Sequence, residues 1–171
     1  MTTDFDVLID FSHPSNIQDI LAHCKKYQKP EVICTTGFDE AATQAIQASS
    51  QQIPILLASN TSQGVNLMHQ LLRKAVQALA EDFDIEIVEK HHNKKLDSPS
   101  GTANSLLETV QTSLPNRRTV EYGRNGMKKR EQQEIGMHSL RGGTIVGEHS
   151  VIFAGEDEII EIKHIAASKK V

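Results

Sequence analysis

The stretch IEIVEKHHNKKLDSPSGTA, from Ile85 to Ala103, joins an apolar segment, a polar loop and the start of a helix. The apolar residues of Ile85–Val88 predict a β-strand, and Ser100-Gly101-Thr102 after Pro99 predicts a helix N-terminus. The loop between them contains two adjacent histidines, two lysines and an aspartate. A strand end, a cluster of titratable groups and a helix N-terminus are together typical of an anion-binding catalytic site.

The side chains of this loop favour proton transfer and anion binding. His91 or His92, at the end of the strand, can point into a cleft and donate a proton near neutral pH. Lys95 precedes the free N–H groups of the helix start, and this combination favours a carboxylate or phosphate ligand. The residues alone leave open ordinary loop histidines, a plain helix cap with solvated lysines, and a histidine zinc site. Neither an HExxH motif nor a cysteine cluster supports zinc, and the Walker spacing is absent.

The chain before this stretch alternates apolar strands with helices. We expect strands at 7–9, 32–34 and 53–58, and helices at about 16–27 and 39–49. This alternation predicts a parallel, doubly wound sheet, in which ligands lie beyond the carboxyl ends of the strands. Those ends, at 10–13, 35–38 and 59–62, are small and polar. No Gly-rich dinucleotide turn precedes them, so either the sheet binds another ligand or the chain begins partway through a domain.

After residue 62 the pattern changes to helices followed by strands. We expect helices at 64–80 and 100–113 and strands at 85–88, 134–140, 144–153 and 158–166. The basic segment 117–133 predicts a mobile loop or excursion, while 141–143 and 154–157 predict hairpin turns. We interpret Arg141-Gly142-Gly143 and Gly147-Glu148-His149 as turn and strand geometry. Five other histidines are interpreted as surface residues: His13, His23, His69, His138 and His164.

The composition excludes several classes of protein. The 171 residues carry a net charge of -4, which argues against general nucleic-acid or membrane binding. No apolar run approaches the length of a membrane span, and the acidic N-terminus lacks the features of a signal peptide. Cys24 and Cys34 have no metal-type spacing, so we expect a cytoplasmic protein.

The central motif resembles the signature of a known enzyme family. Glu89-x-His91-His92-Asn93-x-Lys95-x-Asp97-x-Pro99-Ser100-Gly101-Thr102-Ala103 is similar to that of 4-hydroxy-tetrahydrodipicolinate reductase, also called dihydrodipicolinate reductase. Further matches lie at 9–12, 35–38, 60–66 and 141–149. The resemblance implies an oxidoreductase that reduces a cyclic dicarboxylate with NADH or NADPH on the bacterial route to diaminopimelate and lysine. It also implies an α/β fold, with a partial Rossmann-like domain at 1–62 and an α+β substrate-binding and oligomerisation domain at 63–171.

The resemblance also implies residue roles. His91 matches the proposed general acid, and Lys95 matches the second catalytic residue, which stabilises developing negative charge. The positions that hold the substrate carboxylates correspond to His92, Ser100, Gly101 and Thr102. The positions that contact the nicotinamide half of the cofactor correspond to Cys34, Thr35, Thr36, Gly37, Ala58, Ser59, Asn60 and Thr61. The family often has a smaller residue where Cys34 stands. Relatives form a homotetramer through the second domain, and no metal is implied.

The chain departs from the family pattern at both ends. The first strand, the Gly-rich pyrophosphate turn and the residue that selects NADH or NADPH would all precede Met1, and relatives continue beyond Val171. We therefore expect a complete substrate site and an incomplete cofactor site. A catalytically incompetent fragment that retains dicarboxylate binding or assembly is the main alternative. A histidine-based metal hydrolase is a further one.

Overall fold

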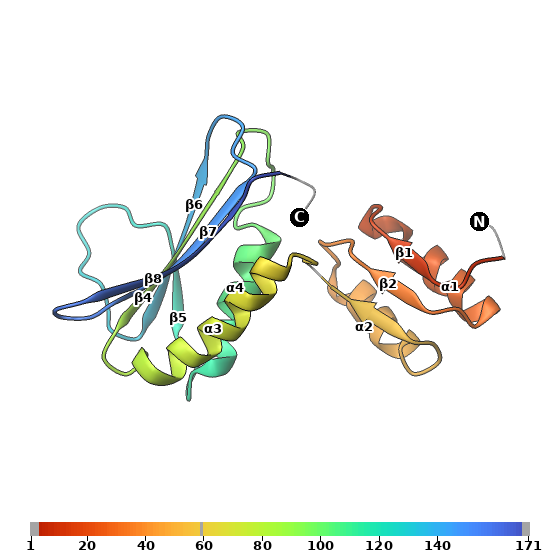
Figure 1. Ribbon diagram of the computed structural model, residues 1–171, viewed down its shortest axis with the longest axis horizontal. Helices are drawn as coiled ribbons and strands as arrows, with labels where there is room; N and C mark the ends of the chain where they lie inside the picture. The colour runs from red at the N-terminus through yellow and green to blue at the C-terminus, as the bar shows by residue number, and fades with distance from the viewer. Residues whose placement is uncertain (1–3, 59, 169–171) are drawn as a thin grey trace. The chain divides into compact units, whose positions relative to one another are not determined.

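The computed structural model describes residues 4–58 and 60–168 of the chain. The chain divides into two compact units, Met1–Thr61 and Ser62–Val171 (Figure 1). We call them the N-terminal unit and the C-terminal unit and describe each by itself. No helix of the described residues is both long enough and apolar enough to cross a membrane.

The N-terminal unit contains a three-stranded parallel sheet in the order β1-β2-β3. The elements are β1 (Leu8–Asp10), the 3-10 helix η1 (Pro14–Asn16), α1 (Ile17–Tyr27), β2 (Glu31–Ile33), α2 (Glu40–Ser49) and β3 (Ile55–Leu57). Helix α1 forms because its buried residues, such as Ile17, Leu21 and Cys24, recur at helical spacing. Helix α2 begins after Asp39, whose carboxylate accepts the Ala42 N–H at 2.7 Å. The predicted alternation of parallel strands and helices is confirmed.

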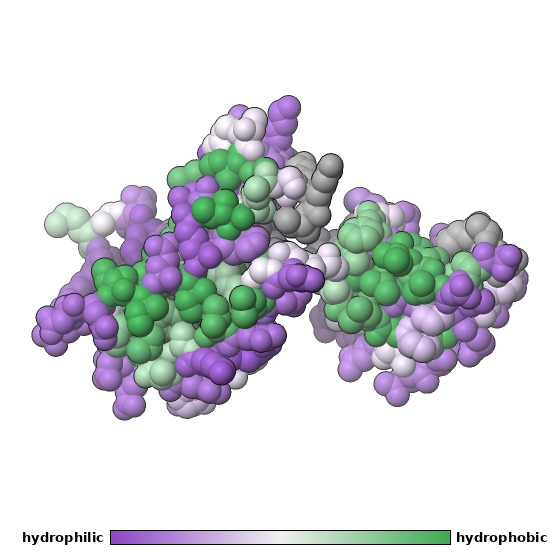
Figure 2. Space-filling model, viewed as in Figure 1, coloured by the Kyte–Doolittle hydropathy of each residue, from purple (hydrophilic) through white to green (hydrophobic). Residues whose placement is uncertain are grey.

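Both helices of the N-terminal unit pack on one face of its sheet. Right-handed crossovers between strands in sequential order place α1 and α2 on the same side. The other face exposes Ile9 and Leu56, 58% and 59% accessible, which flank Val32 in the strand register. Figure 2 shows hydrophobic surface over these strands. The partial Rossmann-like parallel sheet expected from the sequence is confirmed, and within the described residues both of its helices return to the same face.

The C-terminal unit contains a five-stranded mixed sheet in the order β5-β6-β4-β7-β8, with α3 and α4 on one face (Figure 1). The elements are α3 (Gln63–Leu79), β4 (Asp84–His91), α4 (Gly101–Ser113), β5 (Thr119–Tyr122), β6 (Glu134–Arg141), β7 (Gly147–Ala154) and β8 (Ile159–Ala166). Central β4 is parallel to β6 and antiparallel to β7. Leu72, Ile85, Leu106 and Phe153 are completely buried between sheet and helices. The mixed α+β architecture expected for this half is confirmed.

Two local expectations are wrong in the C-terminal unit. The segment 117–133 was expected to be a loop, but it contains β5, which pairs in parallel with β6. The turn at 141–143 does not close a hairpin, because β4 lies between β6 and β7. Local turn residues cannot reveal that an earlier strand inserts between two later ones. The hairpin expected at 154–157 is confirmed, since β7 and β8 are antiparallel neighbours.

Candidate active site

The buried face of β4 changes from apolar to polar along the strand. Alternate residues of a strand share a face, so Ile85, Ile87, Glu89 and His91 all point toward the helices. The first two belong to the hydrophobic core, whereas Glu89 is 0% and His91 is 9% exposed. The strand continues to His91, further than the sequence pattern predicted. This extension directs Glu89 and His91 to the same side.

Glu89 is surrounded by hydrogen-bond donors. Its Oε2 lies 2.6 Å from His91 Nδ1 and accepts from Arg141 Nη1 at 2.8 Å. Its Oε1 accepts from Arg141 Nη2 at 2.7 Å and from the Ser100 N–H at 3.2 Å. Burial raises the pKa of the Glu89 carboxyl, but hydrogen bonds from Arg141, Ser139 and His91 outweigh burial and lower that pKa to about 2. Glu89 is therefore a buried carboxylate anion.

His149 and Gly147 on β7 complete the surroundings of His91. The ring of His149 meets that of His91 edge to face, with 5.2 Å between the centroids. His149 Nε2 lies 3.0 Å from Ser100 Oγ. Burial, with a smaller effect of His91, lowers the pKa of His149 to about 4, so this ring is neutral at pH 7. A Cβ at Gly147 would lie 3.1 Å from His91 Nε2, so the glycine leaves room beside this nitrogen.

Helix α4 starts next to Glu89, His91 and His149, because Ser100 contacts both Glu89 and His149. Ser100 is its N-cap, and Ser100 Oγ accepts the Ala103 N–H at 3.1 Å. The hydroxyl and N–H of Ser100 are thus both used in contacts within the protein. Gly101 is different, because a Cβ added there would meet nothing within 4 Å. Open space next to the first turn of a helix leaves its N–H groups accessible to an anion.

The predicted site residues of the loop lie in one continuous segment. Lys95 Nζ forms an ion pair with Asp97 Oδ1 at 2.7 Å, and half-buried His92 follows the end of β4. The Asp97 carbonyl accepts from Arg141 Nη2 at 2.7 Å, and the Gly142 N–H donates to the His91 carbonyl at 2.9 Å. The segment interpreted from sequence as a turn, Arg141-Gly142-Gly143, is therefore bonded directly to the end of β4 and to the loop that follows it.

Sequence reasoning gave Glu89, Arg141 and His149 no part in the site. The Glu89–His91 contact was readable, because residues two apart on a strand share a face. It was missed because the expected strand ended at Val88. The positions of Arg141 and His149 depend on the strand order, which local pattern does not give.

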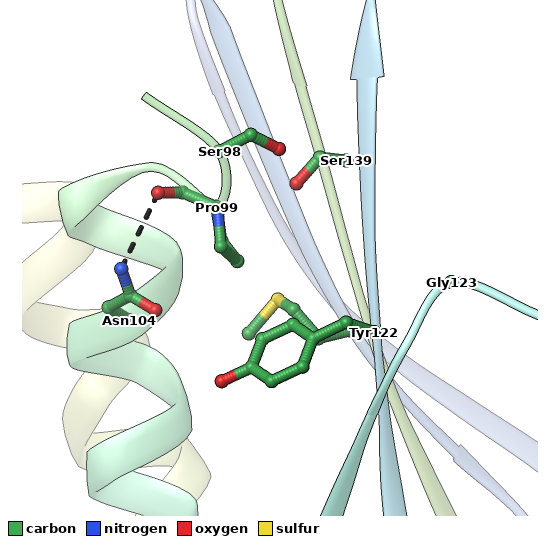
Figure 3. A pocket seen from close by; sticks show the side chains of 7 residues that line it. Ser98, Pro99, Asn104, Tyr122, Gly123 and Ser139 are labelled. Atoms are coloured by element: carbon green, nitrogen blue, oxygen red, sulfur yellow. Dashed lines mark hydrogen bonds between the residues drawn. The ribbon is translucent and has the colours of Figure 1, made fainter. Parts of the chain in front are cut away.

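A pocket of about 650 Å³ lies beside this cluster on the helix-covered side of the sheet. Figure 3 shows Ser98 and Ser139 at one end and the ring of Tyr122 at the other. Pro99 and Asn104 form its wall at the start of α4, where Asn104 Nδ2 donates to the Pro99 carbonyl at 3.4 Å. The pocket therefore shares the segment 98–99 with the loop between β4 and α4.

The predicted cofactor residues of the N-terminal unit lie at the carboxyl ends of β2 and β3. The N–H groups of Cys34 and Thr35 both donate to the Asp10 carbonyl, at 2.8 and 3.1 Å, which joins this turn to the end of β1. Thr35 is buried, whereas Thr36 is exposed. Gly37 has a φ of +84°, which a residue with a side chain rarely adopts, and a Cβ there would meet nothing within 4 Å.

The remaining predicted cofactor residues follow β3. The Ala58 N–H donates to the Ile33 carbonyl at 2.9 Å, and Asn60 and Thr61 come after it. Ser59 lies outside the described residues. Within residues 4–58 and 60–168, no group of three or more histidine, cysteine, aspartate or glutamate side chains could hold a metal ion.

Comparison with protein families gives matches along both units. Residues 1–61 match the family model "Dihydrodipicolinate reductase, N-terminus", and residues 64–171 match "Dihydrodipicolinate reductase, C-terminus". A 4-hydroxy-tetrahydrodipicolinate reductase from Exiguobacterium sibiricum is 56% identical over 100% of this chain and 68% of its own length. One from Brachyspira hyodysenteriae is 50% identical over 97% of this chain and 71% of its own length. The chain thus spans about two-thirds of these relatives.

Solved structures give a consistent result. The dipicolinate-bound dihydrodipicolinate reductase from Paenisporosarcina sp. TG-14 has a TM-score of 0.69 and 25% identity, covering 94% of this chain and 62% of that one. A probable dehydrogenase from Thermotoga maritima has a TM-score of 0.62 at 9% identity, with 96% and 59% covered, and shows a shared fold alone.

Proposed function

The chain belongs to the dihydrodipicolinate reductase family, and we propose that it reduces 4-hydroxy-tetrahydrodipicolinate to tetrahydrodipicolinate. The family is one of NAD(P)H-dependent oxidoreductases in diaminopimelate and lysine biosynthesis, as the central motif predicted. One observation carries the proposal for this chain. His91, Lys95 and the open start of α4 all lie in one continuous segment. A proton donor, a cation and a helix N-terminus are what the reduction of a dicarboxylate requires.

The nicotinamide cofactor, when bound, would supply the hydride that reaches the substrate ring, and the 4-hydroxyl group of the substrate leaves as water. His91 donates the accompanying proton from Nε2, since Nδ1 is bound to Glu89. Lys95 stabilises the negative charge that develops as the ring is reduced. The substrate carboxylates are held by His92 and by the first turn of α4 at Ser100, Gly101 and Thr102. Of these, Gly101 offers the most open approach to the backbone.

The turn after β2 fits a nicotinamide. Thr36 is exposed, and Gly37 presents backbone with no Cβ in the way, so a flat ring can approach closely. We assign the nicotinamide contacts to Cys34, Thr35, Thr36 and Gly37, and to the segment 58–61. The roles of the two domains follow: residues 1–62 bind the cofactor, and residues 63–171 bind the substrate and assemble. The substrate class agrees with the dipicolinate named in the Paenisporosarcina structure.

A homotetramer is the assembly we propose. The sheet of the C-terminal unit has helices on one face only, and Leu140, Ile159 and Ile165 are exposed on its strands. Burial of such a face between copies is the expected use of an uncovered sheet. We place the protein in the cytoplasm, with no nucleic-acid or membrane partner.

The acid and cation roles are tested by two substitutions. We expect His91→Gln and Lys95→Ala each to lower kcat about 100-fold or more, the usual loss when a proton donor or a preorganised charge is removed. The assay follows oxidation of NADH or NADPH with the dicarboxylate. His23→Gln and Lys74→Ala are matched controls outside the site and leave turnover unchanged. Near-wild-type turnover in both His91→Gln and Lys95→Ala would contradict the roles.

A second candidate is a chain that binds the dicarboxylate without turnover. All proposed substrate and acid-base residues lie in the C-terminal unit, so dicarboxylate binding does not depend on the cofactor residues. Calorimetric titration with NADH separates the two candidates. Micromolar cofactor binding supports the reductase, while dicarboxylate binding without cofactor binding supports the second candidate.

A further inference from the structure

Buried Glu89 and half-buried Arg141 form an ion pair next to His91. We propose that this pair is the positioning device of the active site, which orients His91 so that Nε2 faces the substrate and delivers the proton. The proposal rests on the proposed function, in which His91 is the acid. It assigns the pair a role through His91, without contact to substrate.

The ionised carboxylate of Glu89 decides which ring nitrogen of His91 can donate a proton to the substrate. A carboxylate only accepts hydrogen bonds, so the Nδ1 atom 2.6 Å from Glu89 Oε2 must carry a hydrogen. The exchangeable proton is therefore at Nε2. This nitrogen lies beside Gly147, where an added Cβ would be 3.1 Å from it. The carboxylate binds Nδ1, and no side chain of residue 147 blocks Nε2. The ring is therefore held in the orientation in which Nε2 can donate a proton.

Arg141 prevents Glu89 from rotating away. Its Nη1 donates to Glu89 Oε2 at 2.8 Å and its Nη2 donates to Oε1 at 2.7 Å, in the two-pronged geometry that an arginine fork favours. The same guanidinium donates to the carbonyls of Asp97 and Leu140. The Ser100 N–H holds Oε1 from the side of α4. The carboxylate is thus fixed from β6 and from the start of α4, and the loop between β4 and α4 holds Arg141 in turn.

Arg141 also balances the negative charge of Glu89, which lies next to His91. Arg141 pairs with the Glu89 carboxylate and opposes its charge. The other titratable group packed against His91 is His149 on β7, which is neutral at pH 7; Lys95 in the loop and His164 on β8 both act on His149. Loss of the anion and loss of the cation should therefore move the pH dependence of proton donation in opposite directions.

The experiment uses Glu89→Gln and Arg141→Gln in the full chain with two measurements. The first is nitrogen NMR of the histidine rings, which reports the protonated nitrogen of His91 whether or not the protein turns over. The second is kcat/KM against pH. We expect Glu89→Gln to lose the single Nδ1–H form, to lower kcat 10–100-fold and to move the alkaline fall in activity about one pH unit lower. Arg141→Gln moves that fall to higher pH.

The chain contains a matched control on the other face of β4. Glu86 is bound by Arg124 at 2.6 Å, by Arg130 at 3.0 Å and by His138 Nε2 at 2.7 Å. Glu86→Gln therefore removes a similar carboxylate from a similar set of partners, and it leaves the His91 signals and the pH profile unchanged.

Three outcomes decide the proposal. Unchanged His91 nitrogen signals in Glu89→Gln overturn it, as do pH profiles that shift in the same direction in both variants. Changed signals in a protein that lacks turnover support the positioning role and count against the reductase function instead. If Glu89→Gln does not fold, Arg141→Lys takes its place, because lysine keeps the charge and loses the fork. That variant keeps the position of the pH profile while kcat falls.

Discussion

Glu31 in the N-terminal unit and Glu89 in the C-terminal unit are both glutamates on the buried face of a strand, 1% and 0% exposed. Their surroundings differ in one respect. Within the described part of the chain, neither oxygen of Glu31 has a hydrogen-bond partner, whereas four donor contacts reach the two oxygens of Glu89. Burial, and then repulsion by Asp10, raises the pKa of Glu31 to about 7, while that of Glu89 falls to about 2.

The comparison shows that donors, and not burial, decide whether a buried carboxyl is charged. Glu89 lies where a helix N-terminus and a neighbouring strand both supply N–H groups. Glu31 lies between Asp10 and the buried thiol of Cys24, and burial followed by the charge of Glu31 raises the pKa of that thiol to about 11. The Glu89 carboxylate is part of the candidate site. The Glu31 carboxylate lowers the stability of the N-terminal unit above pH 7.

The largest effect is expected when the Glu89 pair is broken. Arg141→Met leaves a buried carboxylate without its cation, which costs about 3–5 kcal/mol of unfolding free energy. Urea unfolding, followed through amide signals of β4 and β6, measures the loss. The double variant Glu89→Met/Arg141→Met removes both charges and should lose much less. An equal loss in the double variant would show that the charges are not the cause.

A smaller effect of opposite sign is expected at Glu31. Glu31→Met removes the buried carboxyl, and above pH 7 it should raise the stability of the N-terminal unit by about 2–3 kcal/mol. The folded-state pKa of Glu31 is about 7 and the ordinary value is 4.5, so wild-type stability falls as pH rises between these values. The gain should therefore shrink toward pH 4.5. Thermal unfolding at pH 4.5 and pH 8 checks this, and equal gains at both pH values would contradict it.

The C-terminal unit has the opposite pH dependence through His149. Its pKa is depressed from 6.5 to about 4, so the folded state binds fewer protons than the unfolded state between these values. The stability contributed by neutral His149 is present above pH 6.5 and is lost as pH falls toward 4. Acidification thus stabilises the N-terminal unit through Glu31 and destabilises the C-terminal unit through His149.

Much of the fold was predictable from local pattern. The helical spacing in α1 and the N-cap at Ser100 are set by residues close in the sequence. Strand β5 was missed because Thr119–Tyr122 is short, polar at its ends and surrounded by basic residues, and only pairing with β6 makes it a strand. The 141–143 turn was misread because a glycine pair looks alike in a hairpin and in a longer connection.

The site was predictable in its continuous part only. His91, His92, Lys95 and Ser100–Thr102 lie in one segment, so their proximity follows from sequence alone. Arg141 and His149 reach the site because β6 and β7 flank β4 on opposite sides. That order results from packing over the whole sheet, which no local window of sequence contains.

The smallest test of the comparison concerns Ser139, whose hydroxyl also lowers the pKa of Glu89. Ser139→Ala removes one donor and keeps Arg141, His91 and the Ser100 N–H in place. Because the remaining donors still satisfy both oxygens, the loss of stability should be under about 1 kcal/mol. Urea unfolding of this variant beside Arg141→Met measures the difference. A loss as large as that of Arg141→Met would mean that the number of donors, and not the opposing charge, keeps Glu89 ionised.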